Sequence, residues 1–355
     1  MTIESNSMIR IGSREIGTHV RPFLIAEMSG NHNRSFERAL QIVDAAAAAG
    51  ADAIKLQTFT ADTMTLDSDA PGFVIEDKDS LWAGRQLYDL YGEAATPYEW
   101  HAQLMGRARA HGMEILSTPF DESAVDFLES LNFPAYKIAS FECTDLPLIR
   151  KVASTGKPLI ISTGMASLAE IDEAVQAARG AGGRHIVLLK CTSTYPATPE
   201  NTNIRTIATL REAFGTEAGL SDHTMGCGVA VAAVSFGATV IEKHFTTSRA
   251  DGGVDSAFSL EPSEFAVLRV ESERAWQGIG EVRFGATSAE TKSLHFRRSL
   301  YVVRDIEAGE SLTHENVRAI RPGFGLAPKH LDQVIGCAVR ERVKRGTPLS
   351  WSLLK

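Results

Sequence analysis

The sequence predicts a (β/α)₈ TIM barrel followed by a small β-rich domain. Eight short apolar runs alternate with helix-like stretches in the first 280 residues, which fits the repeat number and size of such a barrel. Polar side chains stand at or just past the C-terminal end of each run, where barrel enzymes keep their active sites. A doubly wound open sheet is the runner-up, but the first run continues into EMSGNHN and not into a Gly-x-Gly-x-x-Gly loop.

The eight predicted strands are nearly continuous apolar runs, which is typical of a parallel sheet covered on both faces. The helix-like stretches between them, such as 35–51 and 168–182, often end near Gly, a signal for a helix C-terminus. The predicted strands are residues 23–29, 53–59, 114–120, 135–141, 158–164, 185–193, 218–224 and 240–246.

The connection after the second strand, residues 60–97, is much longer than an ordinary βα loop. Long connections in compact domains are often lids or binding loops. This one carries Phe73, Trp82, Tyr88 and Tyr91. We expect part of it to cover a substrate, and residues 82–91 mostly to pack on the barrel rim.

The character of the chain changes near residue 280. Residues 281–294 are rich in charged and small residues and are predicted to be a linker between a barrel domain, residues 1–280, and a last domain, residues 295–355. The last domain has short β-like pieces separated by AGE, RPG and RGT turns. It is too short to bury a large core alone, so we expect it to dock on another surface.

Composition argues against several classes of function. The net charge of −8 argues against general nucleic-acid binding, which needs clustered Lys and Arg. The four cysteines form no Cys-x-x-Cys pair, which argues against a zinc ribbon and favours reduced thiols. No run approaches the ~20 apolar residues of a membrane span. We therefore expect a cytoplasmic protein with no membrane partner and no nucleic-acid partner.

Two histidines indicate a metal site. His223 and His244 stand at the ends of the seventh and eighth predicted strands, which are neighbours in a barrel. Imidazole is a common ligand for Zn, Mn, Fe and Co, and two histidines with open positions suit a catalytic ion. A single histidine would more often bond a backbone carbonyl, but two at matched positions favour the metal.

Two lysines indicate an anion site. Lys55 and Lys137 belong to the second and fourth predicted strands, and hydroxyl side chains end several of the others, which suggests a phosphate or carboxylate cradle. A Schiff-base aldolase or lyase is the alternative, but it needs one desolvated lysine and no metal. Glu27 could act as a general base or form an ion pair with Lys55.

Seven stretches occur in order along the chain: FLIAEMSGNHN, AIKLQTF, STPFD, YKIASFE, ISTGMA, GLSDHT and EKHFT. Together they resemble the sialic acid synthase family, which condenses phosphoenolpyruvate with an amino sugar. The C-terminal part resembles the antifreeze-like SAF domain of those enzymes, a β-clip. Two further stretches, LWAGRQLYDLYGEAATPYEW and GGVDSAFSLEP, are similar to the pseudaminic acid synthase branch.

The resemblance implies condensation of phosphoenolpyruvate with 2,4-diacetamido-2,4,6-trideoxy-L-altrose and water, giving pseudaminic acid and phosphate. It implies a divalent ion, Mn²⁺ ahead of Mg²⁺ or Co²⁺, between His223 and His244, and it implies that Glu27 guides the attacking water. Residues that match sugar contacts are Gln57, Glu142 and Asp255. Residues that match phosphoenolpyruvate contacts or lie beside them are Lys55, Thr118, Lys137, Ser140, Ser162, Ser193, Tyr195 and Ser221.

The resemblance also implies a domain-swapped homodimer, in which Arg321 reaches the sugar N-acetyl group in the other subunit. One position departs from the family: Ser193 stands where the neuraminate branch has asparagine, which puts a direct hydrogen bond there in doubt. An N-acetylneuraminate or legionaminic acid synthase is the alternative within the family. An ice- or glycan-binding role for residues 295–355 is the non-enzymatic alternative.

Overall fold

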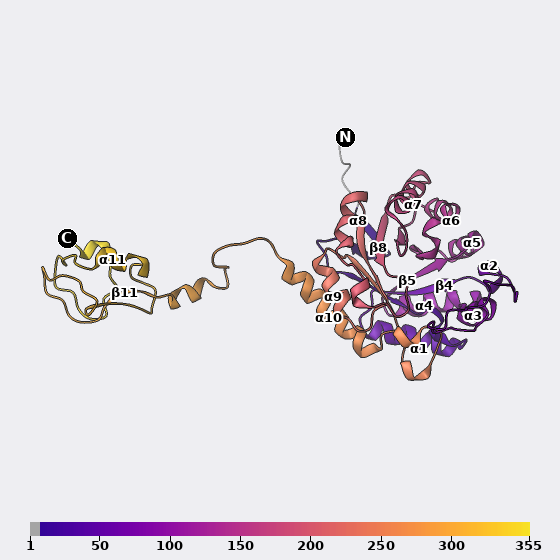
Figure 1. Cartoon of the computed structure of the whole chain (residues 1–355), viewed down its shortest axis with the longest axis horizontal. Coiled ribbons are helices and arrows are strands. Elements are labelled where there is room, and N and C mark those ends of the chain that lie inside the picture. The colour runs from indigo at the N-terminus through magenta and orange to yellow at the C-terminus, as the bar shows by residue number, and fades with distance from the viewer. Residues whose placement is uncertain (1–7) are drawn as a thin grey trace. The chain divides into compact units, whose positions relative to one another are not determined.

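The computed structural model describes residues 8–355, and the chain divides into two compact units. The first unit ends at Gly280 and the second runs from Glu281 to Lys355. Figure 1 shows a helix-wrapped sheet in the first unit and a smaller, mostly irregular second unit. In the part of the chain that is described, no helix combines the length and the apolar character needed to cross a bilayer.

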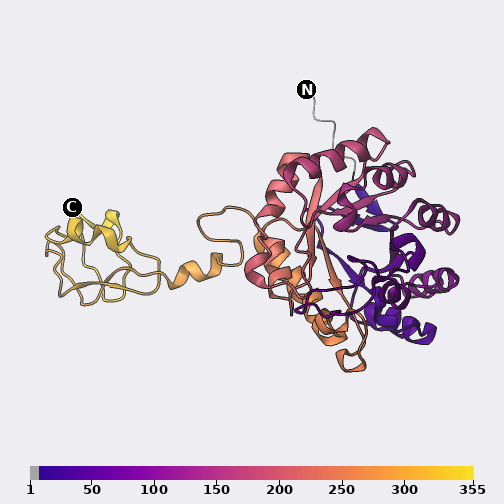
Figure 2. The same ribbon diagram turned by 45° about the vertical axis from the view of Figure 1, so that its right-hand side comes forward.

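The predicted barrel is confirmed. Eight parallel strands close in the order β10-β3-β4-β5-β6-β7-β8-β9. Figure 2, turned from the first view, shows the helices arranged around this sheet. The strands are β3 (Phe23–Glu27), β4 (Ala53–Thr58), β5 (Glu114–Pro119), β6 (Tyr136–Ile138), β7 (Leu159–Ser162), β8 (Ile186–Cys191), β9 (Glu217–Asp222) and β10 (Val240–His244).

The helices begin and end where the local sequence directs. Ser35 and Asp121 each cap a helix through the side chain, and Ser167 with Glu170 forms a capping box. Gly215 ends another helix in the left-handed conformation. The barrel helices are α1 (Phe36–Ala48), α4 (His101–Ala110), α5 (Glu122–Ser130), α6 (Leu146–Ala153), α7 (Leu168–Gly180), α8 (Thr206–Phe214), α9 (Gly228–Ser235) and α10 (Pro262–Ile279).

Alternation along each strand separates two cores. In β10, Val240 belongs to the apolar cluster inside the barrel, whereas Ile241 belongs to the cluster between sheet and helices. Because successive side chains of a strand point to opposite faces, Glu242 and His244 share the inner side with Val240. The same alternation turns Lys55 inward, two positions after the interior residue Ala53.

A short N-terminal hairpin, which the sequence analysis does not predict, adds to the interior core. Strands β1 (Ile9–Ile11) and β2 (Arg14–Ile16) pair antiparallel, and their isoleucines belong to the interior cluster. This cluster includes Phe23 and Val240, the first residues of their strands. The hairpin therefore packs against the end of the barrel that lies opposite the predicted site.

The long connection, which we call the lid segment (residues 60–97), contains α2 (Ala61–Met64) and α3 (Leu87–Ala94). An antiparallel bridge between Val74 and Gln86 folds the stretch between these helices. The indole Nε1 of Trp82 donates a hydrogen bond of 2.9 Å to the carbonyl of Val254, which lies after β10. The lid segment, which follows β4, is thus held to the loop after β10, two strands away in the barrel.

The second unit has its own small core. Strands β11 (Ser299–Val302) and β12 (Val317–Ile320) pair antiparallel, and isolated bridges join other pieces of the unit. A short helix, α11 (Leu331–Val334), contributes Val334 to ten buried apolar residues. The stretch predicted as a linker contains the start of a 3₁₀ helix, Thr291–Phe296.

Candidate active site

Two buried lysines and two buried glutamates form a cluster at the C-terminal end of the barrel strands. Lys55 pairs with Glu27, and its Nζ lies 3.6 Å from Oε1 of Glu242. The Nζ of Lys137 lies 4.0 Å from the same oxygen. Each of these side chains is at most 5% exposed, so the charges interact with little screening by water.

Burial and charge pairing act in opposite directions on these groups. Burial raises the pKa of Glu27 and outweighs the opposing effect of Lys55. Burial lowers the pKa of Lys137, although Glu242 opposes this. For Glu242, burial would raise the pKa, but Lys137 and Lys55 together hold it below its ordinary value. The cluster therefore contains one carboxylate that is firmly ionised and one that takes up a proton more readily.

Hydroxyl groups surround the lysines. Thr118 accepts a 3.1 Å hydrogen bond from Lys55, and Ser221 lies 3.4 Å from Glu242. The hydroxyls of Ser140 and Ser162 are buried and have no partner among the described residues. Buried hydroxyls are normally satisfied, so unpaired ones at the same end of the barrel as two lysines suit the binding of an anion.

Gly164 explains how Ser140 and Ser193 come together. Its φ of +25° and its packing leave no room for a side chain. A Cβ there would lie 2.4 Å from Cβ of Ser140 and 2.7 Å from Oγ of Ser193. The loop after β7 can approach both serines closely only because this position is glycine.

The two histidines are neighbours, as predicted. The ring centroids of His223 and His244 are 5.3 Å apart. The Nδ1 of His223 bonds the carbonyl of Thr192 at 2.9 Å, which fixes the orientation of the ring. The Nδ1 of His244 is buried without a hydrogen-bond partner and lies 3.7 Å from a carboxylate oxygen of Asp255.

This pair fits a metal with two protein ligands. Burial lowers the pKa of His244 well below its usual range, which favours the neutral form that binds metals. Burial alone would lower the pKa of His223 as well. The interaction with Cys191 opposes this, and the pKa of His223 lies above its ordinary value. Within residues 8–355, no three His, Cys, Asp or Glu side chains gather as a metal site. An ion here would need substrate or water as its remaining ligands.

A cavity of about 450 Å³ opens above these groups. Its lining includes His244 and five other predicted site residues, together with part of the lid segment. Gln57 joins the cavity to the charged cluster, because its side-chain amide donates to Glu27 at 3.2 Å. The five other predicted residues are Gln57, Glu142, Ser193, Tyr195 and Asp255.

Aromatic rings close one side of this cavity. The ring of Tyr195 lies 4.5 Å from that of His223 and 5.8 Å from that of Trp82, between centroids. Burial raises the pKa of Glu142, and one of its oxygens is buried without a partner. Trp82 and Tyr91 line the cavity, so they do more than pack on the barrel rim.

Two residues of this site have no role predicted from the sequence. Glu242 contacts both lysines, and the alternation of β10, two positions before His244, could have identified it. Ser29 bonds Asp255 and accepts a 3.1 Å hydrogen bond from Gln57. Among the predicted residues, only Arg321 belongs to the second unit, where it is exposed.

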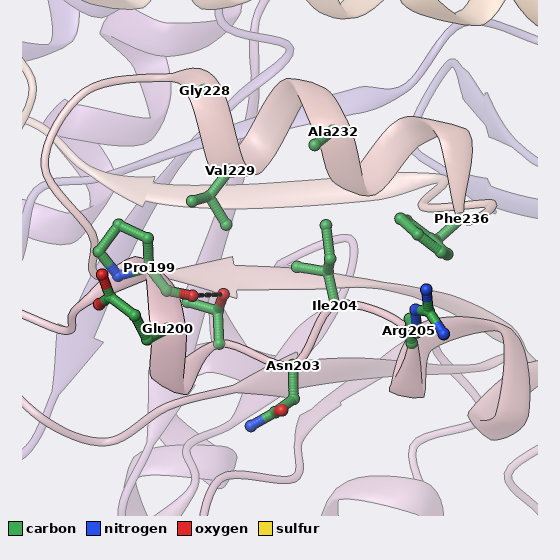
Figure 3. A pocket seen from close by; sticks show the side chains of 10 residues that line it. Pro199, Glu200, Asn203, Ile204, Arg205, Gly228, Val229, Ala232 and Phe236 are labelled. Carbon is green, nitrogen blue, oxygen red and sulfur yellow. Dashed lines mark hydrogen bonds between the residues drawn. The ribbon is translucent and has the colours of Figure 1, made fainter.

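A second hollow, of about 440 Å³, contains none of the predicted site residues. Figure 3 shows the segment 199–205 facing side chains of α9, with Ile204 and Val229 extending toward each other. Its wall is mainly apolar and has no lysine or histidine, so it lacks the groups that the cluster in the barrel provides.

The chain matches known families and relatives over most of its length. The NeuB family matches residues 42–283 and the SAF domain matches residues 297–355. The pseudaminic acid synthase of Campylobacter jejuni is 42% identical over 94% of this chain and 96% of its own. The N,N'-diacetyllegionaminic acid synthase of Legionella pneumophila is 35% identical over 96% of each chain. The crystal structure of N-acetylneuraminic acid synthetase from Leptospira borgpetersenii has a TM-score of 0.72 at 30% identity, covering 82% of this chain and 96% of that one.

Proposed function

This chain belongs to the NeuB family, and from that membership we propose that it acts as a pseudaminic acid synthase. It condenses phosphoenolpyruvate with 2,4-diacetamido-2,4,6-trideoxy-L-altrose and water, giving pseudaminic acid and phosphate. The observation that carries the proposal is that a buried two-lysine cluster joins, through Gln57, a cavity that contains His244. The higher identity to the pseudaminic than to the legionaminic relative supports this sugar.

The cluster suits the anionic substrate. Phosphoenolpyruvate carries a phosphate and a carboxylate, which Lys55 and Lys137 would neutralise in place of the two glutamates. The unpaired hydroxyls of Ser140 and Ser162 support this reading because each can donate to an anionic oxygen. Other hydroxyls in reach of the same anion belong to Thr118, Ser193, Tyr195 and Ser221.

His223 and His244 would hold the divalent metal, which we propose to be Mn²⁺, with Mg²⁺ and Co²⁺ as other candidates. The unpartnered Nδ1 of His244 and the fixed orientation of His223 support this assignment. When bound, the ion would supply Lewis-acid polarisation of the sugar aldehyde.

The remaining chemistry is the formation of the carbon–carbon bond, the addition of water, and the proton transfers that accompany them. C3 of phosphoenolpyruvate bonds to the aldehyde carbon, whose oxygen gains a proton, and water then adds to C2 before phosphate leaves that carbon. Glu27 is placed in this scheme to take the proton of the water, because its buried carboxyl has a raised pKa. The polar side chains of Gln57, Glu142 and Asp255 would bind the hydroxyl and amide groups of the sugar.

We propose that the enzyme is a domain-swapped homodimer, with Arg321 of one subunit reaching the sugar N-acetyl group in the other. Exposed apolar side chains on the βα loops and at the start of α7 support a docking surface at the barrel mouth, since such patches usually mark contacts. These side chains are Phe141, Met165, Leu168 and Met225. A fully active monomer in light scattering would contradict this arrangement.

A cytoplasmic location is part of the same proposal. All four cysteines are free, as expected in a reducing compartment. Fractionation of cells that produce the protein, followed by an activity assay of each fraction, would check the location.

The first experiment measures phosphate release from phosphoenolpyruvate with the altrose derivative, before EDTA, after EDTA and after adding Mn²⁺. We expect activity to be lost with EDTA and restored by Mn²⁺. Activity that survives EDTA, with a substrate adduct trapped by borohydride, would instead favour a Schiff-base enzyme using Lys55 or Lys137. Faster release with N-acetylmannosamine or the legionaminic precursor would reassign the sugar.

A further inference from the structure

One side of helix α3 faces the substrate cavity and is apolar. Leu87, Leu90, Tyr91 and Ala94 all line the cavity. Their spacing of i, i+3, i+4 and i+7 puts them on a single helix face. Ile75, from the folded stretch before the helix, lines the same cavity.

The barrel contributes polar side chains to the same cavity, beside the apolar rings of Phe59, Phe120 and Phe141. Gln57, Glu142 and Asp255 come from the ends of the strands or the loops that follow them. The cavity therefore offers hydrogen-bond partners on the barrel side, whereas the aliphatic side chains of the α3 face offer none. Asp77, Ser80 and the hydroxyl of Tyr91 are polar groups that the lid segment adds elsewhere in the lining.

The orientation of the sugar follows from the proposed function, on which this inference rests. The aldehyde carbon must meet phosphoenolpyruvate near the lysines and His244, deep in the barrel. The other end of the six-carbon chain must then lie farther out, where the lid segment closes the cavity.

We propose that the α3 face and Ile75 select the sugar by its methyl groups, above all the C6 methyl of a 6-deoxy sugar. A hydroxyl at C6 would lose water on entry and find no hydrogen-bond partner on the leucine face. Apolar pockets reject an added hydroxyl by up to about 100-fold, so we expect a preference of about 10–100-fold in kcat/KM.

The lid segment is held firmly enough to act as a wall. Trp82 bonds Val254, and the backbone N–H of Leu87 donates to the carbonyl of Phe73 at 2.8 Å. The ring of Tyr91 packs edge-on against Phe59 of the barrel, 5.9 Å between centroids. Two of these contacts join the lid segment to the barrel, at Phe59 after β4 and at Val254 after β10, and the third holds the lid segment together.

The test compares kcat/KM for the 6-deoxy altrose derivative and its 6-hydroxy analogue, with phosphoenolpyruvate and Mn²⁺. Wild type should prefer the 6-deoxy sugar, and Leu87→Asn and Leu90→Asn should each lower this ratio at least 5-fold. Leu66→Asn is the matched control, since Leu66 is an exposed leucine of the lid segment outside the cavity, and its ratio should stay unchanged. Leu87 is only partly buried, so its variant should fold even if the Leu90 variant does not.

The outcomes separate this inference from the proposed function. Equal kcat/KM values for the two sugars in wild type, or an unchanged ratio in a folded Leu87→Asn variant, would overturn the inference alone. An equal change in the Leu66→Asn control would also overturn it. Absence of phosphate release with both sugars would overturn the proposed function and the inference together.

Discussion

Lys243 holds the loop that carries one of the proposed metal ligands. Its side chain is fully buried, lies 2.9 Å from the carboxylate of Asp222 and donates to the carbonyls of Thr224 and Gly226. His223 lies inside this clamped stretch. We therefore predict that Lys243→Met both destabilises the barrel and weakens metal binding.

The size of the effect follows from burial. Removing one partner of a buried ion pair costs about 3–5 kcal/mol, because the other charge remains without compensation. The first unit has 280 residues, and about 2.1 cal/mol/K per residue gives an unfolding entropy of about 0.6 kcal/mol/K. The Tm of the barrel should fall by about 5–8 °C. Loss of an outer-shell partner typically weakens metal affinity about 10–100-fold.

The assay combines calorimetry with direct titration of Mn²⁺ into the metal-free protein. The double variant Asp222→Asn/Lys243→Met should recover part of the lost Tm, since it leaves no lone buried charge, yet it should not recover the metal affinity. A single variant that melts within 1 °C of wild type, or binds Mn²⁺ with unchanged affinity, would refute the reasoning.

Three further outcomes are expected. Gly164→Ala should raise the KM for phosphoenolpyruvate at least 10-fold with an unchanged circular dichroism spectrum, because the new methyl displaces Ser140 and Ser193; an unchanged KM would exclude the proposed anion site. Burial lowers the pKa of His32 and of His101 to about 4, so the stability that depends on their neutral forms is complete above about pH 6.5 and is lost as pH falls toward 4. Calorimetry should show Tm decreasing over that interval, and a constant Tm would contradict this. Mn²⁺ at 100 times its Kd should stabilise the metal-free protein by about 2.7 kcal/mol, or about 4–5 °C; no shift would mean that no tight site exists.

Strand positions and inward-facing residues could be predicted because one periodicity determines both. Once residues 53–59 are read as a strand, alternation turns Lys55 and Gln57 to the same side. The structure confirms this, since Lys55 reaches the charged cluster and Gln57 lines the cavity. The strand predicted over 135–141 is shorter, Tyr136–Ile138, because the chain turns into a 3₁₀ helix from Phe141.

Contacts that are distant in the sequence could not be predicted in the same way. Trp82 reaches Val254, which is 172 positions further along the chain, and this bond fixes one edge of the cavity. Nothing in the local sequence of the lid segment indicates that partner. The N-terminal hairpin cannot be predicted from the sequence for a related reason, since strands of three residues carry little periodicity and gain their stability from the barrel interior.

Strand β10 shows how alternation along a strand and contacts between distant residues together determine the site. Glu242 and His244 face inward to the proposed anion and metal sites, while Lys243 between them faces outward and clamps the loop of His223. A shift of one residue in the register would exchange these faces, burying a lysine among the proposed metal ligands and removing the clamp. The parallel pairing of His244 with Glu27 and of Lys243 with Asp222 excludes that shift. Three consecutive residues thus belong to the proposed anion site, the loop clamp and the proposed metal site, so an insertion within β10 should abolish phosphate release, Mn²⁺ binding and the clamp together.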